Sequence, residues 1–386
     1  MHYWDRISAT QPAPEVLEAV TAMLSKPLGN AQSPQKLGSL AAAELETSRT
    51  RVASMINADL HEIVFTSNGT EANNLAILGL SSAVTGKQAN PRRIIYSSIE
   101  HVSISKPVSF LSKQGFDVAV IPVDGKGRID RARYMNALSE EVALVSIQLA
   151  NPEIGTIQTL DDLVAAAHQV GAIFHTDAVA AAGWIPIDVK ALDVDALSLA
   201  ATSFHGIPGA GALFVRKGIR CRSVMYGGIQ EQGKRPGTEN IPAIVAMSIA
   251  AELAQVEMQD RMNRMRKLAG LLKDRLSHIE AVEFTGDWEN RLPGHVSLVV
   301  DGVEGESLLL MLDMKGINAA SGSSCTAKDL KISPVLTALG LDQARAQGSL
   351  VFSADRSTSV EDASAVIEAL PDIIHRLRQM SPLWSK

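Results

Sequence analysis

Seven short runs of apolar and β-branched residues lie between residues 62 and 216, and most are separated by enough residues for a helix. Strands that alternate with helices are typical of a mainly parallel sheet, because each parallel pair needs a crossover connection. The last two runs are too close for a crossover, so we expect an antiparallel edge there. The runs are EIVFTS (62–67), RIIYSS (93–98), DVAVIP (117–122), VALVSIQ (142–148), AIFHTD (172–177), ALSLAA (196–201) and GALFVR (211–216).

The rest of the chain indicates a second, smaller unit. Residues 242–279 predict one long helix, apolar at first and amphipathic later, that leads out of the sheet domain. The strand pattern HVSLVVDG (295–302) and a last helix that ends in LPDIIHRLRQM (370–380) predict an α+β domain. We therefore expect an α/β fold with a large domain over residues 1–255, whose N-terminal arm (1–15) packs on a small C-terminal domain over residues 256–386.

Charge and cysteine content narrow the classes of function. The net charge of -6 gives no bulk electrostatic reason to expect nucleic acid or an anionic membrane as a partner. No apolar run follows the acid in MHYWDR (1–6), and the apolar stretch around residues 241–251 is too short to span a bilayer. Cys221 and Cys325 lie far apart and form no disulfide framework. We expect a cytoplasmic protein that binds neither nucleic acid nor membrane.

The residues that follow the predicted strands are the candidates for a ligand site, because open parallel sheets bind ligands beyond the carboxyl ends of their strands. Gly69 and Thr70 can offer backbone N–H groups and a hydroxyl to a phosphate, although a simple helix cap is the alternative. His101 follows the second strand, where a lone histidine is more often a structural group than a ligand. Asp177 closes an apolar strand, so its carboxylate needs either a backbone cap or a cationic ring nitrogen.

Long stretches of the sequence resemble the cysteine desulfurases of the class V aminotransferase group, which are fold type I pyridoxal phosphate enzymes. The resemblance extends over nearly the whole chain rather than over a single motif. It implies a large domain built on a seven-stranded, mainly parallel sheet. The stretches are GNAQSPQKLG (29–38), EIVFTSNGTEANNLAI (62–77), NPEIGTIQ (151–158), HTDAVAAAGWIPIDV (175–189), GGIQEQGKRPGTENIPAIVAM (227–247), SGSSCTAKDL (321–330) and MSPLW (380–384).

The resemblance implies roles for five residues. Thr70 would contact the phosphate of pyridoxal phosphate, His101 would stack on its pyridine ring, and Asp177 would pair with its protonated ring nitrogen. Thr238 would reach the phosphate of the other subunit's cofactor, which implies a homodimer. Cys325 falls on the catalytic cysteine, whose thiolate attacks the substrate sulfur and then holds that sulfur as a persulfide.

The sequence departs from the family at the lysine that binds the cofactor covalently and shuttles protons. An alignment of residues 185–215 without gaps puts Ser203 at the lysine position. Ala200 and Thr202 then replace a serine and a histidine that bind the phosphate. Shifting the turn retains a histidine at His205 but puts Gly206 at the lysine. No alignment of this segment therefore supplies the amine.

Further expected groups are also replaced. Lys190 is the only lysine in residues 178–216, and it precedes the strand and should lie on the outside. Pro152 stands in place of an asparagine that contacts the cofactor's phenolic oxygen, and Ala180 in place of a glutamine. Val351 replaces the arginine that binds the substrate carboxylate, whereas Arg356 matches a different arginine. We therefore expect a degenerate site in which pyridoxal phosphate is bound without a covalent bond or not at all.

Cys325 argues for a retained function. It lies in AASGSSCTAKDLK (319–331), a small and polar stretch that predicts an exposed loop and resembles the long-loop branch of the family, which delivers sulfur to scaffold proteins. An exposed thiol can accept a persulfide, or supply one thiolate to an iron–sulfur cluster shared with a partner. Arg220 and Arg222 could lower the pKa of Cys221, although a surface position without a role is the alternative.

Three functions remain open from the sequence. The favoured one is a desulfurase-like dimer that works in sulfur transfer or iron–sulfur cluster assembly with Cys325 as its chemical group, together with an iron–sulfur scaffold or a sulfur acceptor. The second is an active desulfurase or lyase with non-covalently bound pyridoxal phosphate and His101 or His205 as its proton shuttle. The third is a structural subunit in which Cys325 has no role.

Overall fold

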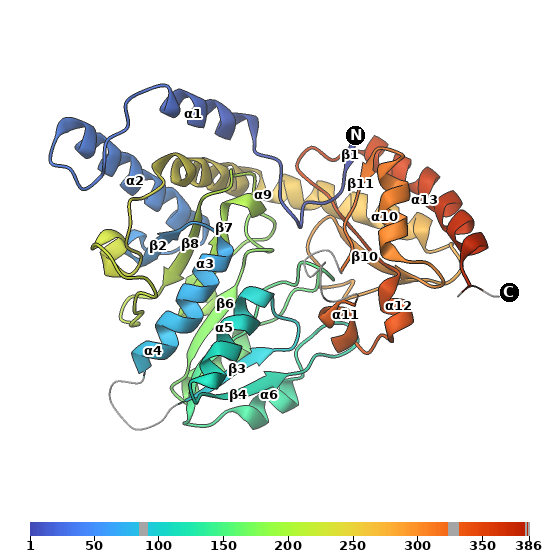
Figure 1. Ribbon diagram of the computed structural model, residues 1–386, viewed down its shortest axis with the longest axis horizontal. Coiled ribbons are helices and arrows are strands. Elements are labelled where there is room, and N and C mark those ends of the chain that lie inside the picture. The colour runs from blue at the N-terminus through green and yellow to red at the C-terminus, as the bar shows by residue number, and fades with distance from the viewer. Residues whose placement is uncertain (85–91, 323–331, 383, 385–386) are drawn as a thin grey trace.

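A seven-stranded sheet forms the centre of the larger part of the protein in the computed structural model, which describes residues 1–84, 92–322, 332–382 and 384 (Figure 1). The strands lie in the order β2-β8-β7-β6-β5-β3-β4. Each predicted run forms one of them, which confirms the α/β class and the mainly parallel sheet. They are β2 (Ile63–Thr66), β3 (Arg93–Ser97), β4 (Asp117–Ile121), β5 (Val142–Ser146), β6 (Ile173–Asp177), β7 (Ala196–Ala200) and β8 (Gly211–Val215).

The position of β8 differs from the prediction. β8 pairs antiparallel with β7, as expected, but it also pairs antiparallel with β2, from Ile63 opposite Phe214 to Thr66 opposite Gly211. The edge strand is therefore β2, which local sequence could not show because the two strands are far apart in the chain. Since β2 is antiparallel to β8, it runs in the same direction as the other strands. The carboxyl ends of six strands consequently meet at one edge of the sheet.

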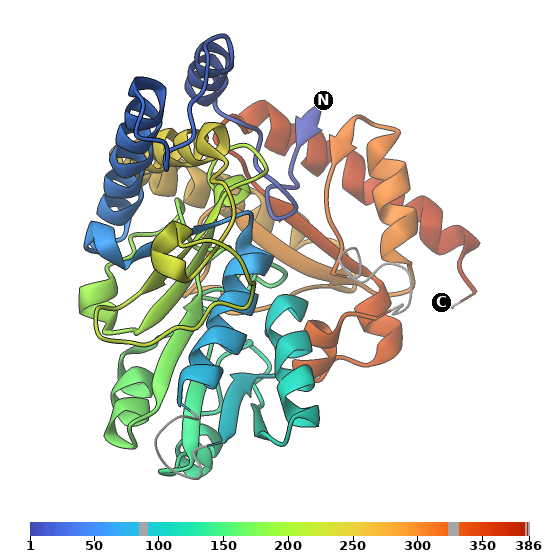
Figure 2. The ribbon, with the colours of Figure 1, turned by 60° about the vertical axis from the view of Figure 1, so that its left-hand side comes forward.

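Helices cover both faces of this sheet (Figures 1 and 2). The stretch that follows β2 is a continuous helix with a central π-helical segment. The helices are α1 (Pro14–Leu24), α2 (Lys36–Met55), α3 (Gly69–Asn74), the π-helix η2 (Leu75–Leu80), α4 (Ser81–Val84), α5 (Val102–Lys113), α6 (Arg131–Ala137), α7 (Asp161–Gln169) and α8 (Val189–Leu192). Short 3-10 turns are η1 (Leu60–Glu62), η3 (Ala201–Ser203) and η4 (Gln230–Gly233).

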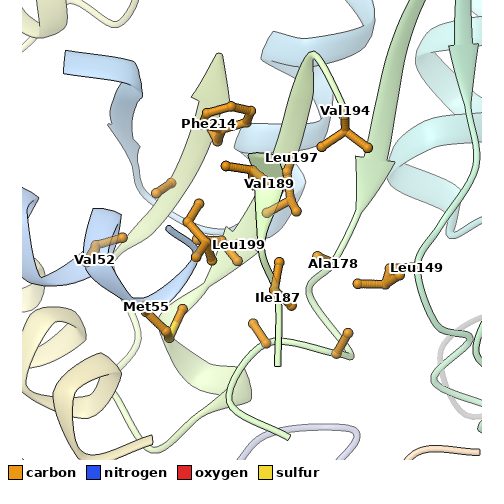
Figure 3. Close-up of a cluster of buried hydrophobic side chains, with 14 of the residues drawn as sticks. Val52, Met55, Leu149, Ala178, Ile187, Val189, Val194, Leu197, Leu199 and Phe214 are labelled. Atoms are coloured by element: carbon orange, nitrogen blue, oxygen red, sulfur yellow. The ribbon is translucent and has the colours of Figure 1, made fainter. Parts of the chain in front are cut away.

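Successive residues of one strand enter different cores. Phe65 of β2 belongs to the core that includes Val52 of α2, whereas its neighbour Val64 belongs to the core that includes Ala72 of α3. Figure 3 shows part of the first core, which contains Val52 of α2 together with Leu199 and Phe214 of the sheet. Burial of each such side chain contributes about 1.5–3 kcal/mol. Strands buried on both faces explain why the runs are apolar throughout rather than alternating.

The long helix α9 (Ile241–Leu276) joins the two parts of the protein, close to its predicted bounds. Ala243 and Ala254 near its start pack in the core of the large sheet, and Met265 and Leu272 pack in a C-terminal core. Part of α9 is long and apolar enough to cross a membrane by length and composition, and 56% of that part is buried inside the protein. The proposed domain boundary near residue 255 falls inside this helix and remains a prediction.

The C-terminal part contains a three-stranded antiparallel sheet in the order β12-β10-β9. The N-terminal strand β1 (His2–Tyr3) pairs with β11 (Ile317–Asn318), and Asp5 bridges to Ser353, so the N-terminal arm lies on this part of the protein (Figure 2). The remaining elements are β9 (Val282–Phe284), β10 (His295–Val300), β12 (Ser349–Ser353), α10 (Gly305–Asp313), α11 (Pro334–Ala338), α12 (Gln343–Gln347) and α13 (Val360–Met380).

Candidate functional site

A cavity of about 330 Å³ lies at the carboxyl edge of the large sheet. Its wall comes from the segments that follow β2, β3, β5, β6 and β7, from the N-terminal arm, and from residues 321–322 and 334–335 of the C-terminal part. The size is that of a small-molecule site. Among the predicted site residues, the structure brings five to this cavity: Gly69, Thr70, His101, Asp177 and Ser203.

Asp177, the last residue of β6, is a buried carboxylate at the cavity wall. Its Oδ1 accepts a hydrogen bond from the Val179 amide (2.9 Å), and its Oδ2 accepts one from Asn73 Nδ2 (2.7 Å). No ion pair joins it to any residue that the structure describes. Burial raises the pKa of Asp177, and the two hydrogen bonds oppose that rise. A protonated ring nitrogen in the cavity would supply the missing positive charge.

The start of α3 forms a second wall of the cavity. Asn68 caps the helix, because its Oδ1 accepts a hydrogen bond from the Glu71 amide (2.9 Å). A Cβ added to Gly69 would lie 2.8 Å from Val179 Cγ2 and 3.3 Å from the Ala200 Cβ, so a larger residue would require the Val179 side chain to shift. The Glu71 carboxylate pairs with Arg235 (2.8 Å), which offsets its charge near the helix start. This helix start fits a phosphate group.

His101 caps α5, because its side chain accepts a hydrogen bond from a backbone amide of the helix, and it also lines the cavity. Its Nδ1 lies 2.7 Å from Ser103 Oγ and accepts from the Ser103 amide (3.2 Å). The alternative shuttle His205 does not line the cavity, since its buried ring bonds the Gln11 carbonyl through Nδ1 (2.9 Å). Thr238 is exposed and lies outside the cavity of its own chain, so its contact with a second subunit remains a prediction.

The turn after β7 lies where the resemblance would place the lysine. Ala200, Thr202 and Ser203 all line the cavity. The turn is fixed through its backbone, because the Thr202 carbonyl accepts from the Thr10 amide (2.8 Å) and the Ser203 carbonyl accepts from Trp184 Nε1 (2.6 Å). Residues 191–216 contain no lysine, and no described residue of the cavity wall is one.

The structure also places the other residues at which the sequence departs from the resemblance. Pro152 and Ala180 line the cavity, and the Pro152 carbonyl accepts a hydrogen bond from His295 Nε2 (2.8 Å). Val351 is fully buried in the middle of β12 and does not reach the cavity. Arg356 pairs with acids outside the cavity, and Lys190 lies exposed 3.7 Å from Asp59, on the outside as predicted.

Three charged residues of the cavity wall were missed from the sequence: Arg6, Glu100 and Glu153. Burial raises the pKa of both glutamates to about 8. One carboxylate oxygen of each, Oε2 of Glu100 and Oε1 of Glu153, has no hydrogen-bond partner among the described residues. Glu100 immediately precedes His101 at the end of a strand and could have been found by the same argument. Arg6 lies in the N-terminal arm, where no strand end marks it.

Replacing Glu100 with glutamine should make the cofactor-free protein less sensitive to rising pH. The pKa of Glu100 is about 8 in the folded state and ordinarily 4.5, so its contribution to stability is full below about pH 4 and is lost as pH rises through 8. Glutamine has no proton to lose. Between about pH 6 and about pH 7.5, the free energy of unfolding of Glu100→Gln relative to wild type should rise by roughly 2 kcal/mol. Urea unfolding at both pH values measures this difference, and an unchanged difference would contradict the raised pKa.

Of the two cysteines, the structure describes Cys221. Cys325 belongs to residues 323–331, which lie outside the described residues, so its predicted exposure is untested. Burial raises the pKa of the Cys221 thiol to about 12, and this overturns the possibility that the neighbouring arginines lower it. Within the described ranges no group of three or more histidine, cysteine, aspartate or glutamate side chains could bind a metal ion.

The described wall therefore fits part of pyridoxal phosphate. The buried Asp177 carboxylate fits the protonated ring nitrogen, the start of α3 fits the phosphate, and His101 lies at the same wall. The hydroxyl of Ser203, by contrast, cannot form the carbon–nitrogen double bond that a lysine amine forms with an aldehyde.

Comparisons with known proteins agree with the fold and identify the family. Residues 2–365 match the family described as Aminotransferase class-V. The chain is 39% identical to Cysteine desulfurase IscS of Methanosarcina thermophila, over 100% of this chain and 94% of that protein. It is 40% identical to Cysteine desulfurase IscS 1 of Archaeoglobus fulgidus, over 100% of both.

Two solved structures are similar over almost the whole chain. A NifS-like protein superposes with a TM-score of 0.91 at 30% identity, covering 97% of this chain and 99% of that one. SspA in complex with cysteine superposes with a TM-score of 0.80 at 28% identity, covering 93% of this chain and 100% of that one.

Proposed function

Since this chain belongs to the cysteine desulfurases of the class-V aminotransferase family, which have fold type I and use pyridoxal phosphate, we propose that it works in sulfur transfer or iron–sulfur cluster assembly with a cofactor site that lacks its covalent anchor. The turn after β7 supports this proposal most strongly. It brings Thr202 and Ser203 to the cavity at the position expected for the lysine. Asp177 at the cavity wall, together with the absence of lysine from the described part of that wall, favours a cofactor bound only by non-covalent contacts.

The chain's own residues would bind the cofactor at two ends. Gly69 and Thr70 would donate backbone N–H groups to the phosphate, and the Asp177 carboxylate would keep the ring nitrogen protonated. When bound, pyridoxal phosphate supplies an electron sink for an amino acid. The amino acid we propose is cysteine, in keeping with the names of the relatives and with the cysteine complex of SspA.

Cys325 is the proposed sulfur carrier, on the grounds of its sequence position. Its thiolate would attack the terminal sulfur of a donor persulfide, the sulfur–sulfur bond of the donor would break, and the donor would leave as a thiolate. No oxidant or reductant is needed for this exchange. Cys325 could then pass the sulfur to an acceptor protein or an iron–sulfur scaffold in the same manner.

Release of alanine from cysteine tests the degenerate site. We expect the protein to release alanine at least roughly 10²-fold more slowly than the Archaeoglobus fulgidus relative, because a positioned proton donor and acceptor contributes about 10²–10⁴-fold. Added pyridoxal phosphate should not close this gap. A rate that reaches that of the relative when the cofactor is added would instead establish the alternative, an active desulfurase with non-covalent cofactor.

Sulfur uptake tests Cys325 with a matched control. When an active desulfurase and cysteine supply the persulfide, wild type and Cys221→Ser should each gain one sulfur per chain by mass spectrometry, and Cys325→Ser should gain none. If none of the three proteins gains sulfur, the result would favour the alternative of a structural subunit in which Cys325 has no role.

We also propose the homodimer that the sequence implied. Thr238 lies in a segment with four apolar side chains exposed to at least 36%, at positions 224, 225, 226 and 229. An exposed apolar patch of this kind fits a surface that a second copy covers. A solution mass of one 41.2 kDa chain rather than two would contradict the dimer.

A further inference from the structure

Arg6 is a buried cation at the cavity wall with unused hydrogen-bond donors. The residue is 4% exposed and lines the cavity. Its Nε and Nη2 have no hydrogen-bond partner among the described residues. An unpaired buried charge is costly, and burial lowers the pKa of Arg6 to about 9. No carboxylate among the described residues is hydrogen-bonded to these two nitrogen atoms of the guanidinium group.

Asp355, the acid whose charge acts on Arg6, does not bond its free donors. The Asp355 charge raises the pKa of Arg6, but no hydrogen bond joins the two side chains. The Asp355 carboxylate instead accepts hydrogen bonds from the Gln11 amide (3.2 Å) and the Arg356 amide, and it lies 3.4 Å from His205 Nδ1. Asp355 is thus occupied by other donors, and the free donors of Arg6 remain available at the cavity.

The position of Arg6 is fixed by contacts on two sides. Its backbone amide donates to the Ser353 carbonyl at the end of β12 (3.4 Å). Its guanidinium lies over the Trp184 ring, 3.9 Å from the ring centroid, which is a cation–π contact. The same ring donates through Nε1 to the Ser203 carbonyl (2.6 Å). Trp184 therefore orients Arg6 next to the turn that ends in Ser203.

Arg6 lies beside the strand that has lost its own arginine. Val351 occupies the position that the resemblance assigns to the carboxylate-binding arginine, and it is buried in the middle of β12. Ser353, two residues further along β12, bonds the backbone of Arg6. The N-terminal arm thus brings a cation to the cavity, beside the strand on which the resemblance places the expected arginine.

We propose that Arg6 binds the carboxylate of the amino acid that enters the cavity, in place of the arginine lost at Val351. This inference rests on the proposed cofactor and amino-acid site. We assign a carboxylate rather than the cofactor phosphate to Arg6. The helix start that fits the phosphate approaches Ala200 through Gly69, whereas Trp184, which orients Arg6, bonds Ser203. The two anion sites therefore flank opposite ends of the same turn. A planar guanidinium binds a carboxylate through two parallel hydrogen bonds.

Two stable ligands that differ by one carboxylate test the inference. They are the adducts of pyridoxal phosphate with L-alanine and with ethylamine, each reduced to a secondary amine. Titration calorimetry on the full-length protein should show that wild type binds the alanine adduct about 10- to 100-fold more tightly than the ethylamine adduct. The Arg6→Gln variant should bind both equally, and its affinity for the ethylamine adduct should match that of wild type.

Further variants and outcomes make the test decisive. Arg261→Gln is the matched control, because Arg261 also lies over the Trp184 ring (5.2 Å) but bonds Gly183 and Glu257 and does not line the cavity; it should keep the full preference. Arg6→Lys keeps the charge and should show an intermediate preference. Equal binding of both adducts by wild type, or a preference that persists in Arg6→Gln, would overturn the role of Arg6 while leaving the cofactor site intact. Binding of neither adduct would overturn the cofactor site, and the inference with it.

Discussion

Ser203→Lys should retain pyridoxal phosphate through gel filtration, at one cofactor per chain, whereas wild type should lose it. Ser203 lines the cavity, and its turn is fixed by hydrogen bonds to the Thr202 and Ser203 carbonyls, which a new side chain leaves in place. A lysine amine can bond covalently to the cofactor aldehyde, and a serine hydroxyl cannot. The visible absorbance of the filtered protein measures the effect, and borohydride reduction followed by peptide mapping should locate the cofactor on residue 203.

Ser203→Arg is the control for this gain. Arginine adds a long cation at the same place without an amine that can form the bond, so this variant should lose the cofactor on filtration as wild type does. If Ser203→Lys folds, binds the cofactor reversibly and still loses it on filtration, then residue 203 is not the position of the missing lysine.

Asp177→Asn should weaken the binding of pyridoxal phosphate by at least roughly 100-fold, because removing one partner of a buried charge pair costs about 3–5 kcal/mol. The same change should leave the cofactor-free protein at least as stable as wild type near neutral pH. Burial raises the pKa of Asp177, so ionisation of its carboxyl group lowers the free energy of unfolding of the wild type. The amide of the variant does not ionise and avoids this loss. Asn73 can also accommodate the new amide, because its Oδ1 has no partner among the described residues.

Titration with pyridoxal phosphate and thermal unfolding of the same samples give both quantities. Lower affinity together with unchanged or higher stability is the expected pair of results. A change in affinity of less than about threefold would mean that Asp177 does not face the ring nitrogen. Loss of both affinity and stability would mean that the carboxylate serves the fold instead.

The sequence predicted the sheet well because most of its strands, such as β5 and β7, are buried on both faces. Each apolar run, such as residues 142–148, has no polar alternation and is bounded by turn residues, so its position could be read locally. The place of β2 next to β8 could not, because that pairing joins residues about 150 positions apart. Asp177 was found because a carboxylate that ends an apolar strand is unusual wherever it occurs.

The rest of the site depends on contacts between distant segments. Arg6 appears in the sequence as one arginine in an N-terminal arm, and only the pairing of that arm with β12 brings it to the cavity. Its Nε and Nη2 lack hydrogen-bond partners among the described residues, and this is likewise a property of the folded protein. The burial of Cys221 was missed for a related reason, because neighbouring arginines in sequence say nothing about packing against η2. Thr238 and Cys325 remain predictions.

The most direct test of the central claim is a mass analysis of the wild-type protein after incubation with pyridoxal phosphate, borohydride reduction and digestion. We predict that the cofactor is recovered free and that no single lysine carries one cofactor per chain. One cofactor per chain on a single lysine would contradict the account, wherever that lysine lies in the chain, including Lys328 and Lys331 in residues 323–331.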